Sequence, residues 1–256
     1  MKRITLIAFA TLLYASVQAQ SKTPASNQPR QFDVQALTWD NDYFIVNRDS
    51  AYENPYIGLK KLIGGNKRFV AGKSIKPRQN SETIQKLEDG QAPFAIIVGC
   101  SDSRVPNELI FDQGLGNLFI IRTAGQVSAA ASYGSMEFAT LSLKTKLIVV
   151  LGHTECGAVA AAVQRPENVP GHIVTLINEI KPAVAKSAHK PGNKVENAVR
   201  QNVIEQVNNL RDLEPILSRR YNNGEILIVG AIYDIHTGKV EFLKETLTAL
   251  PAYKGK

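Results

Sequence analysis

Three short apolar runs constrain the fold of this 256-residue chain more than any other feature. They cover residues 94–98, 118–121 and 147–151, and a glycine follows the first and the last of them directly. Strands that are buried on both faces of a parallel sheet read as continuous apolar runs rather than as alternating ones. Residues 225–235 carry a similar pattern, and residues 239–243 are expected to add a fifth strand.

Segments with helical periodicity lie between and around these runs, at residues 55–70, 81–88, 133–143, 157–163 and 193–217. Strands that alternate with helices favour a mostly parallel sheet covered on both faces. The sequence therefore predicts one α/β domain over residues 55–256, with a mostly parallel central β-sheet flanked by helices.

The N-terminus predicts an export signal. Lys2 and Arg3 precede an apolar stretch over residues 4–15, and small residues at 17 and 19 suit cleavage after residue 19. An uncleaved anchor or a buried first helix is the alternative, although the stretch is short for a membrane span. We expect residues 1–19 to be a signal peptide, the mature protein to be periplasmic, and no membrane contact after cleavage.

The segment that follows, residues 20–54, is interpreted as a linker and N-terminal arm, because its first part is polar and contains two prolines. Removing residues 1–19 lowers the formal net charge from +7 to +5. The basic residues are scattered along the chain. They therefore favour a solvated surface over nucleic-acid binding, and no nucleic-acid partner is expected.

Two short clusters hold both cysteines of the chain, Cys100-Ser-Asp-Ser-Arg104 and His153-Thr-Glu-Cys156. Two thiolates and an imidazole are typical zinc ligands, and a fourth position left for Asp102 or water is typical of a catalytic zinc. A disulfide between Cys100 and Cys156 is the alternative in an exported protein. Each cluster follows a predicted strand, and ligands of α/β sheets bind at the carboxyl ends of the strands.

The spacing of Asp102 and Arg104 suits a bidentate, charge-assisted pair. Asp102 held by Arg104 would leave the fourth zinc position to water, whereas Asp102 on the zinc would displace that water. The alternative is an ion pair that only fastens a loop. The remaining histidines, His172, His189 and His236, are interpreted as surface or capping residues.

The two clusters together resemble the C-x-D-x-R and H-x-x-C motifs of the β-class carbonic anhydrases. The resemblance extends over roughly residues 55–243 and includes Phe119-Ile-Ile-Arg-Thr-Ala-Gly125. It implies reversible hydration of CO2 to bicarbonate and a proton, through attack of zinc-bound hydroxide on CO2. It also implies one Zn²⁺ per chain on Cys100, His153 and Cys156, with Asp102 as a switchable fourth ligand paired to Arg104.

The same resemblance implies substrate contacts for Gln113 and Gly157, and assembly as a homodimer or homotetramer whose N-terminal helices embrace the partner. The bicarbonate-regulated subtype has a Trp where this chain has Ile97, although Arg122 and Tyr233 match that subtype. We therefore expect the subtype that is always open. A related hydrolase of CS2 or COS and a zinc-stabilised binding module are the alternatives.

Overall fold

The computed structural model describes residues 47–164, 167–248 and 250–254. The predicted signal peptide over residues 1–19 and most of the predicted linker lie outside the described residues. Among the helices that the structure describes, none is long and apolar enough to cross a membrane.

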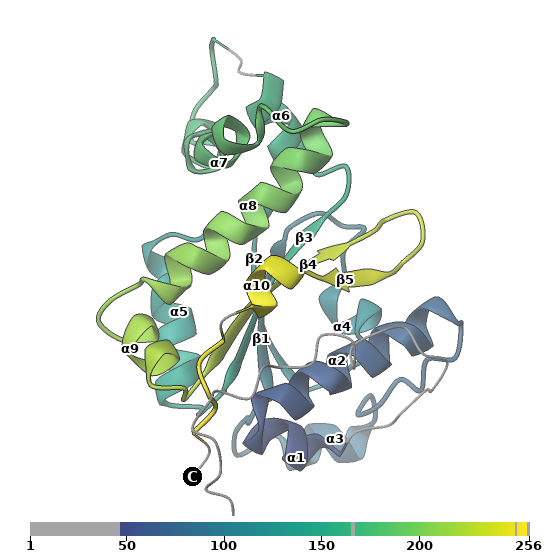
Figure 1. Cartoon of the computed structure of the whole chain (residues 1–256). Helices are drawn as coiled ribbons and strands as arrows, with labels where there is room; N and C mark the ends of the chain where they lie inside the picture. The colour runs from purple at the N-terminus through teal and green to yellow at the C-terminus, as the bar shows by residue number, and fades with distance from the viewer. Residues whose placement is uncertain (1–46, 165–166, 249, 255–256) are drawn as a thin grey trace, which may run out of the picture.

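A five-stranded sheet forms the centre of the molecule (Figure 1), with the strands in the order β2-β1-β3-β4-β5. The strands are β1 Ala95–Cys100, β2 Leu118–Thr123, β3 Leu147–His153, β4 Leu227–Tyr233 and β5 Val240–Phe242. The first four strands are parallel, and β5 is antiparallel to β4. The expected α/β fold with a mostly parallel sheet is confirmed.

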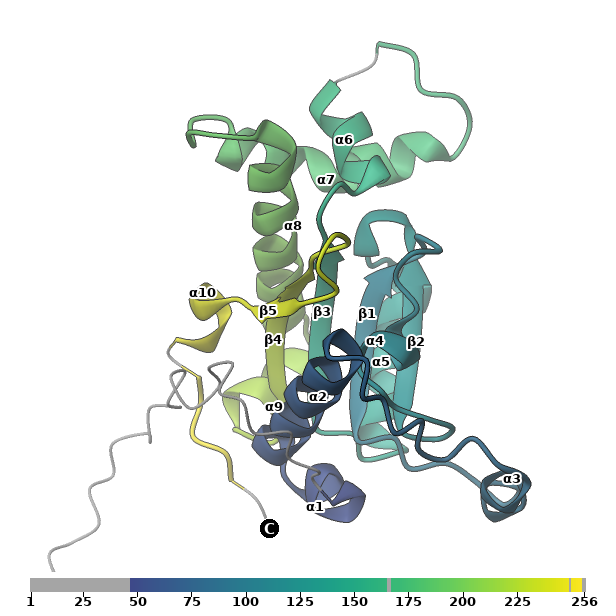
Figure 2. The same cartoon turned by 90° about the vertical axis from the view of Figure 1, so that its right-hand side faces the viewer.

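Helices cover both faces of this sheet, as the two views in Figure 1 and Figure 2 show. Ile97 and Val149 belong to the core on the face of α1 and α2, whereas their strand neighbours Ile96 and Ile148 belong to the core under α5 and α8. The helical elements are α1 Arg48–Glu53, α2 Pro55–Val70, α3 Ser81–Lys86, α4 Asn107–Ile110, the 3-10 turn η2 Ala124–Gln126, α5 Ala130–Leu141, α6 Gly157–Gln164, α7 Ile173–Ser187, α8 Lys194–Arg211, α9 Leu217–Asn222 and α10 Lys244–Leu247.

Part of the predicted arm is integrated into the domain. Asn47 caps α1 through its side chain, and Ala51 in that helix is fully buried in the core of the α2 face. The hydroxyl of Tyr52 donates to the carbonyl of Leu143, which fastens α1 to the segment before β3. The last residues of the 20–54 segment therefore dock on the body of their own subunit.

The glycine pair Gly64-Gly65 does not interrupt α2, which runs unbroken from Pro55 to Val70. A Cβ atom at Gly65 would lie 1.8 Å from the carbonyl oxygen of Phe111. The close approach of α2 to the segment after α4 therefore requires glycine at this position.

Candidate metal centre

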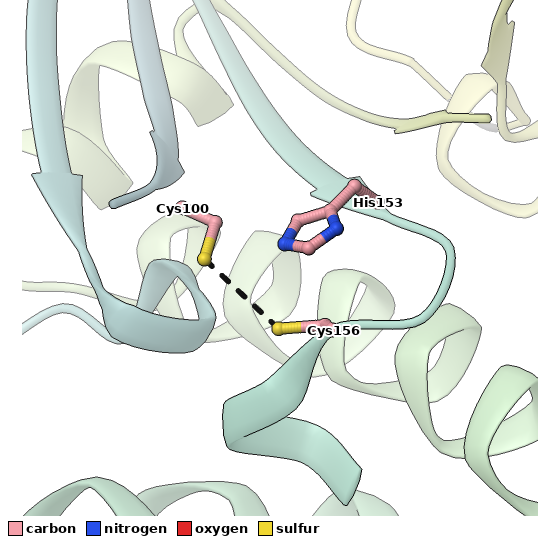
Figure 3. A group of neighbouring side chains, drawn as sticks. All are labelled: Cys100, His153 and Cys156. Carbon is pink, nitrogen blue, oxygen red and sulfur yellow. Dashed lines mark hydrogen bonds between the residues drawn. The ribbon is translucent and has the colours of Figure 1, made fainter. Parts of the chain in front are cut away.

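The two predicted clusters meet at the carboxyl ends of neighbouring strands. Cys100 is the last residue of β1 and His153 is the last residue of β3, and these strands pair directly. Cys156 follows three residues later, immediately before α6. One ligand atom from each of these residues lies within 4.8 Å of the other two (Figure 3).

The three side chains are almost completely removed from solvent. Cys100 is 4% exposed, Cys156 1% and His153 0%. Apolar side chains from α6, α7 and α8, among them Val159, Ile180 and Val199, surround the two cysteines. Such surroundings penalise unpaired polar atoms and strengthen electrostatic interactions.

His153 has one ring nitrogen with a hydrogen-bonding contact and one without. Its Nδ1 lies 2.9 Å from the carbonyl oxygen of Thr154, which fits the tautomer that carries the proton on Nδ1. Its buried Nε2 has no hydrogen-bond partner among the described residues. A metal ion would satisfy the lone pair of Nε2, and the bond to Thr154 would hold the ring in the ligating orientation.

The sulfur atoms of Cys100 and Cys156 lie 4.0 Å apart, and both residues are free cysteines in this structure. Two thiolates on one tetrahedral zinc at about 2.3 Å would be about 3.8 Å apart. The donor set and its spacing therefore fit Zn²⁺ without rearrangement of the backbone.

Protonation of the two thiols is coupled. The contact with Cys156 lowers the pKa of Cys100 to about 4, and backbone N–H groups of Asp102 and Gly125 support that thiolate from 3.4 and 3.3 Å. The same contact, together with burial, raises the pKa of Cys156. A cation bound between the two sulfur atoms would favour ionisation of both thiols.

Burial lowers the pKa of His153, but the contacts with Cys100, Thr154 and Asp102 together outweigh burial, so the net direction is upward. The Cys100 thiolate is the main source of this opposing effect. A metal cation beside Cys100 and His153 would instead lower the pKa of His153, because the cation favours the neutral imidazole as a ligand.

Asp102 and Arg104 form the bidentate pair that their spacing predicts. The Asp102 carboxylate accepts from Nε and Nη2 of Arg104 at 3.0 and 2.8 Å, and from its backbone N–H at 2.9 Å. The hydrogen bonds from the guanidinium lower the pKa of Asp102 far below its ordinary value. One Asp102 oxygen is 3.9 Å from Nε2 of His153, so this carboxylate borders the three ligand atoms.

Arg122, at the end of β2, supports the backbone of the first cluster. Its guanidinium donates to the carbonyl oxygens of Cys100 and Asp102 at 2.9 and 2.6 Å. Ile97 lies in the core of the sheet, and Tyr233 ends β4 opposite His153. Within one subunit, these hydrogen bonds of Arg122 hold the loop that carries Asp102.

Gln113 and Gly157 occupy different settings. Gln113 is buried in the turn before β2, where it donates to Phe111 and accepts from Asn117. Gly157 is exposed at the start of α6, and a Cβ atom there would meet no atom within 4 Å. Open space therefore adjoins Gly157, whereas the side chain of Gln113 stabilises the turn in which it lies.

Gly125 and Asn202 support the site, although neither residue was predicted from the sequence to have a role there. Gly125 adopts a positive φ of 68° in the turn after β2, which directs its N–H to the sulfur of Cys100. Asn202 of α8 donates to the carbonyl of Gly125 at 3.0 Å. The Thr-Ala-Gly sequence at the end of a strand was a signal for Gly125, but Asn202 is distant in sequence.

Comparisons with known proteins agree with this geometry. Residues 95–240 match the protein family described as carbonic anhydrase. Carbonic anhydrase 2 of Mycobacterium tuberculosis is 40% identical over 189 residues, which cover 73% of this chain and 91% of that protein.

Solved structures give the same result. A β-carbonic anhydrase of Sordaria macrospora, described as tetrameric, aligns with a TM-score of 0.59 and 27% identity over 68% of this chain and 92% of its own. The Coccomyxa β-carbonic anhydrase in complex with acetazolamide aligns with a TM-score of 0.59 and 26% identity over 72% of this chain and 86% of its own. The chain therefore belongs to the β class of the carbonic anhydrase family, whose members are lyases.

Proposed function

We propose that this protein catalyses the reversible hydration of CO2 to bicarbonate and a proton, with one Zn²⁺ held by Cys100, His153 and Cys156. The observation that carries the proposal is the buried ligand triad beside an Asp–Arg pair. Three protein ligands leave a position for water or substrate, which is the arrangement of catalytic zinc sites.

Bound zinc would supply Lewis acidity, lowering the pKa of a water so that hydroxide is available to attack the carbon of CO2. The residues of the chain orient and protect this chemistry. Asp102 is ionised and held by Arg104, so its carboxylate can accept a hydrogen bond from the attacking water. The apolar side chains around Cys100 and Cys156 exclude bulk water from the ligand side.

The pairing of Asp102 with Arg104 supports the open subtype of the enzyme. The Asp102 carboxylate accepts three hydrogen bonds from Arg104, so it is not free to bind the metal as a fourth ligand. We propose that Asp102 becomes a ligand only when this pairing is broken. Substrate contacts are proposed for Gly157, whose surroundings are open, and for Gln113.

Assembly and location complete the proposal. We propose a homodimer or homotetramer, which the tetrameric Sordaria macrospora relative supports by analogy. Cleavage after residue 19 would deliver the mature chain to the periplasm, without a membrane or nucleic-acid partner.

Stopped-flow measurement of CO2 hydration by residues 20–256, from about pH 6.5 to about pH 9, tests this function. The rate should rise with pH because more of the zinc-bound water would be hydroxide. The rise should be smooth, because Asp102 stays ionised over the whole range. An abrupt loss of activity below about pH 8 would contradict the open arrangement. Hydrolysis of CS2 or COS by zinc-loaded protein that does not hydrate CO2 would contradict the proposed reaction.

A further inference from the structure

The loop between His153 and Cys156 adopts a backbone conformation that its sequence does not favour. Glu155, between two ligands, has a φ of 55°, in the left-handed region where glycine is at ease and glutamate is not. Such a conformation persists only where surrounding contacts impose it. The contacts that impose it come from β4, from the turn after β4, and from α8.

The end of β4 and the turn after it hold the loop from one side. The N–H of Thr154 donates to the carbonyl of Tyr233 at 3.0 Å, and the N–H of Ile235 donates to the hydroxyl of Thr154 at 3.1 Å. Beyond them, Nε2 of His236 lies 2.8 Å from a carboxylate oxygen of Glu155. His236 is therefore more than the surface or capping residue that its sequence position indicated.

The turn that carries His236 is itself fixed. One carboxylate oxygen of Asp234 accepts from the N–H groups of His236 and Thr237 at 2.8 and 3.3 Å. The carbonyl of Asp234 accepts from the N–H of Gly238 at 2.8 Å. His236 thus projects from a closed turn, which makes it a stable attachment point for Glu155.

Helix α8 holds the loop from the other side. The carboxylate of Glu196, in the first turn of α8, accepts from the backbone N–H of Glu155 at 2.9 Å. The side chain of Asn193 caps the same turn and accepts from the N–H of Glu196 at 3.2 Å. The strained residue is therefore held by its backbone on α8 and by its side chain on His236.

We infer that Glu155, Glu196 and His236 form a clamp that holds the 153–156 loop in its metal-binding geometry. These are positioning residues, since they act on the ligands His153 and Cys156 rather than on substrate. The inference rests on the proposed function, in that it assigns the zinc site to this loop. It extends that function to residues from two other elements, α8 and the turn after β4.

The clamp contacts are exposed, so each contact alone contributes little to the stability of the 153–156 loop. The side chains of His236 and Glu155 are 67% and 55% exposed, and exposed ion pairs are weak. Groups that orient metal ligands nevertheless change metal affinity by about ten- to a hundredfold when removed. We therefore expect a small effect from each single removal and a larger one from the pair.

The rate of zinc release to an excess of a chromogenic chelator tests the clamp on the full mature chain. His236→Ala and Glu196→Ala should each speed release about threefold, and the double variant about tenfold or more. The Co²⁺-substituted double variant should also show shifted d–d absorption bands, because the ligand loop relaxes. If the wild type binds zinc normally but the double variant shows unchanged zinc release and unchanged bands, the clamp is overturned. The proposed zinc site would still stand.

Two variants at Glu155 separate the side-chain contact from the backbone strain. Glu155→Gln keeps an acceptor for His236 and should release zinc at nearly the wild-type rate. Glu155→Gly suits the positive φ but lacks the contact, so it should release zinc faster than Glu155→Gln. Equal rates in these two variants would contradict the role of His236.

Arg219→Ala is the matched control. It removes an exposed ion pair with Glu214 and should leave zinc release unchanged. Arg219 belongs to α9, which lies at the opposite end of the sheet from α6 (Figure 1). Zinc stoichiometry of the wild type is measured first. A wild type that binds no zinc would overturn the proposed function, and the clamp with it.

Discussion

The candidate metal centre has an inner and an outer half that differ in burial, surroundings and place in the fold. The inner half, Cys100, His153 and Cys156, is buried among apolar side chains at the ends of two strands and the start of a helix. The outer half, Asp102 and Arg104, lies in a loop, with side chains 18% and 50% exposed. Cys100 of the inner half nevertheless stands only two residues before Asp102 of the outer half.

The difference indicates a division of labour. Ligands at strand ends share the rigidity of the sheet, so the inner half can hold one geometry. The outer half is bound by hydrogen bonds that water can compete for, so Asp102 can exchange partners at low cost. We expect substitutions in the inner half to remove metal, and substitutions in the outer half to keep metal and change the rate.

Cys156→Ser should have the largest effect. The loss of one thiolate from a buried triad should reduce zinc to below about a tenth per chain and abolish CO2 hydration. Metal analysis and stopped-flow assay on one sample measure both quantities. Retention of zinc at the wild-type level would show that Cys156 is not a ligand, and circular dichroism of the variant controls for folding.

Asp102→Ala should retain zinc and slow CO2 hydration about a hundredfold or more, because the carboxylate that orients water is gone. Hydrogen bonds from Arg104 lower the pKa of Asp102, so Asp102 stays ionised and does not titrate between about pH 6.5 and about pH 9. Asp102→Asn should therefore lower the rate without changing the shape of its pH dependence. Wild-type rates in Asp102→Ala would reduce the residue to a structural role.

Arg104→Ala should slow turnover about tenfold with zinc still bound, because Asp102 loses its charge-assisted partners and can approach the metal. X-ray absorption at the zinc edge should then differ from the wild type. Arg104→Lys, which keeps the charge without the planar fork, should recover part of the rate. An unchanged zinc environment in Arg104→Ala would speak against exchange of partners by Asp102.

Gly157→Ala should have the smallest effect. Its Cβ atom enters open space, so the fold and zinc content should be unchanged. If substrate binds beside Gly157, the added methyl group should raise KM by a few-fold while the thermal midpoint stays constant. An unchanged KM would remove Gly157 from the proposed substrate contacts.

The strands could be predicted because buried parallel strands have a distinctive apolar pattern, and the ligand triad because its residues follow those strands. Two helices show where local pattern fails. Helix α7, Ile173–Ser187, was not predicted; it has Pro182 inside it and no side-chain cap at His172. Helix α8 ends at Arg211 rather than at residue 217, because Pro215 disfavours helical backbone in the residue before it.

Contacts between distant segments were out of reach for a different reason. Asn202 and Gly125 meet across 77 positions, and His236 meets Glu155 across 81. No local pattern in one sequence encodes such pairs, since they depend on how α8 and the turn after β4 pack around the site. The left-handed conformation of Glu155 was equally hidden, because glutamate does not indicate a positive φ.

The most direct test of the central claim is X-ray absorption at the zinc edge on residues 20–256, with zinc content and free thiols measured on the same sample. The account predicts one zinc per chain with two sulfur ligands and one imidazole, and little bound zinc in Cys156→Ser. Protein without zinc and without free thiols would mean that Cys100 and Cys156 form a disulfide, and would contradict the account.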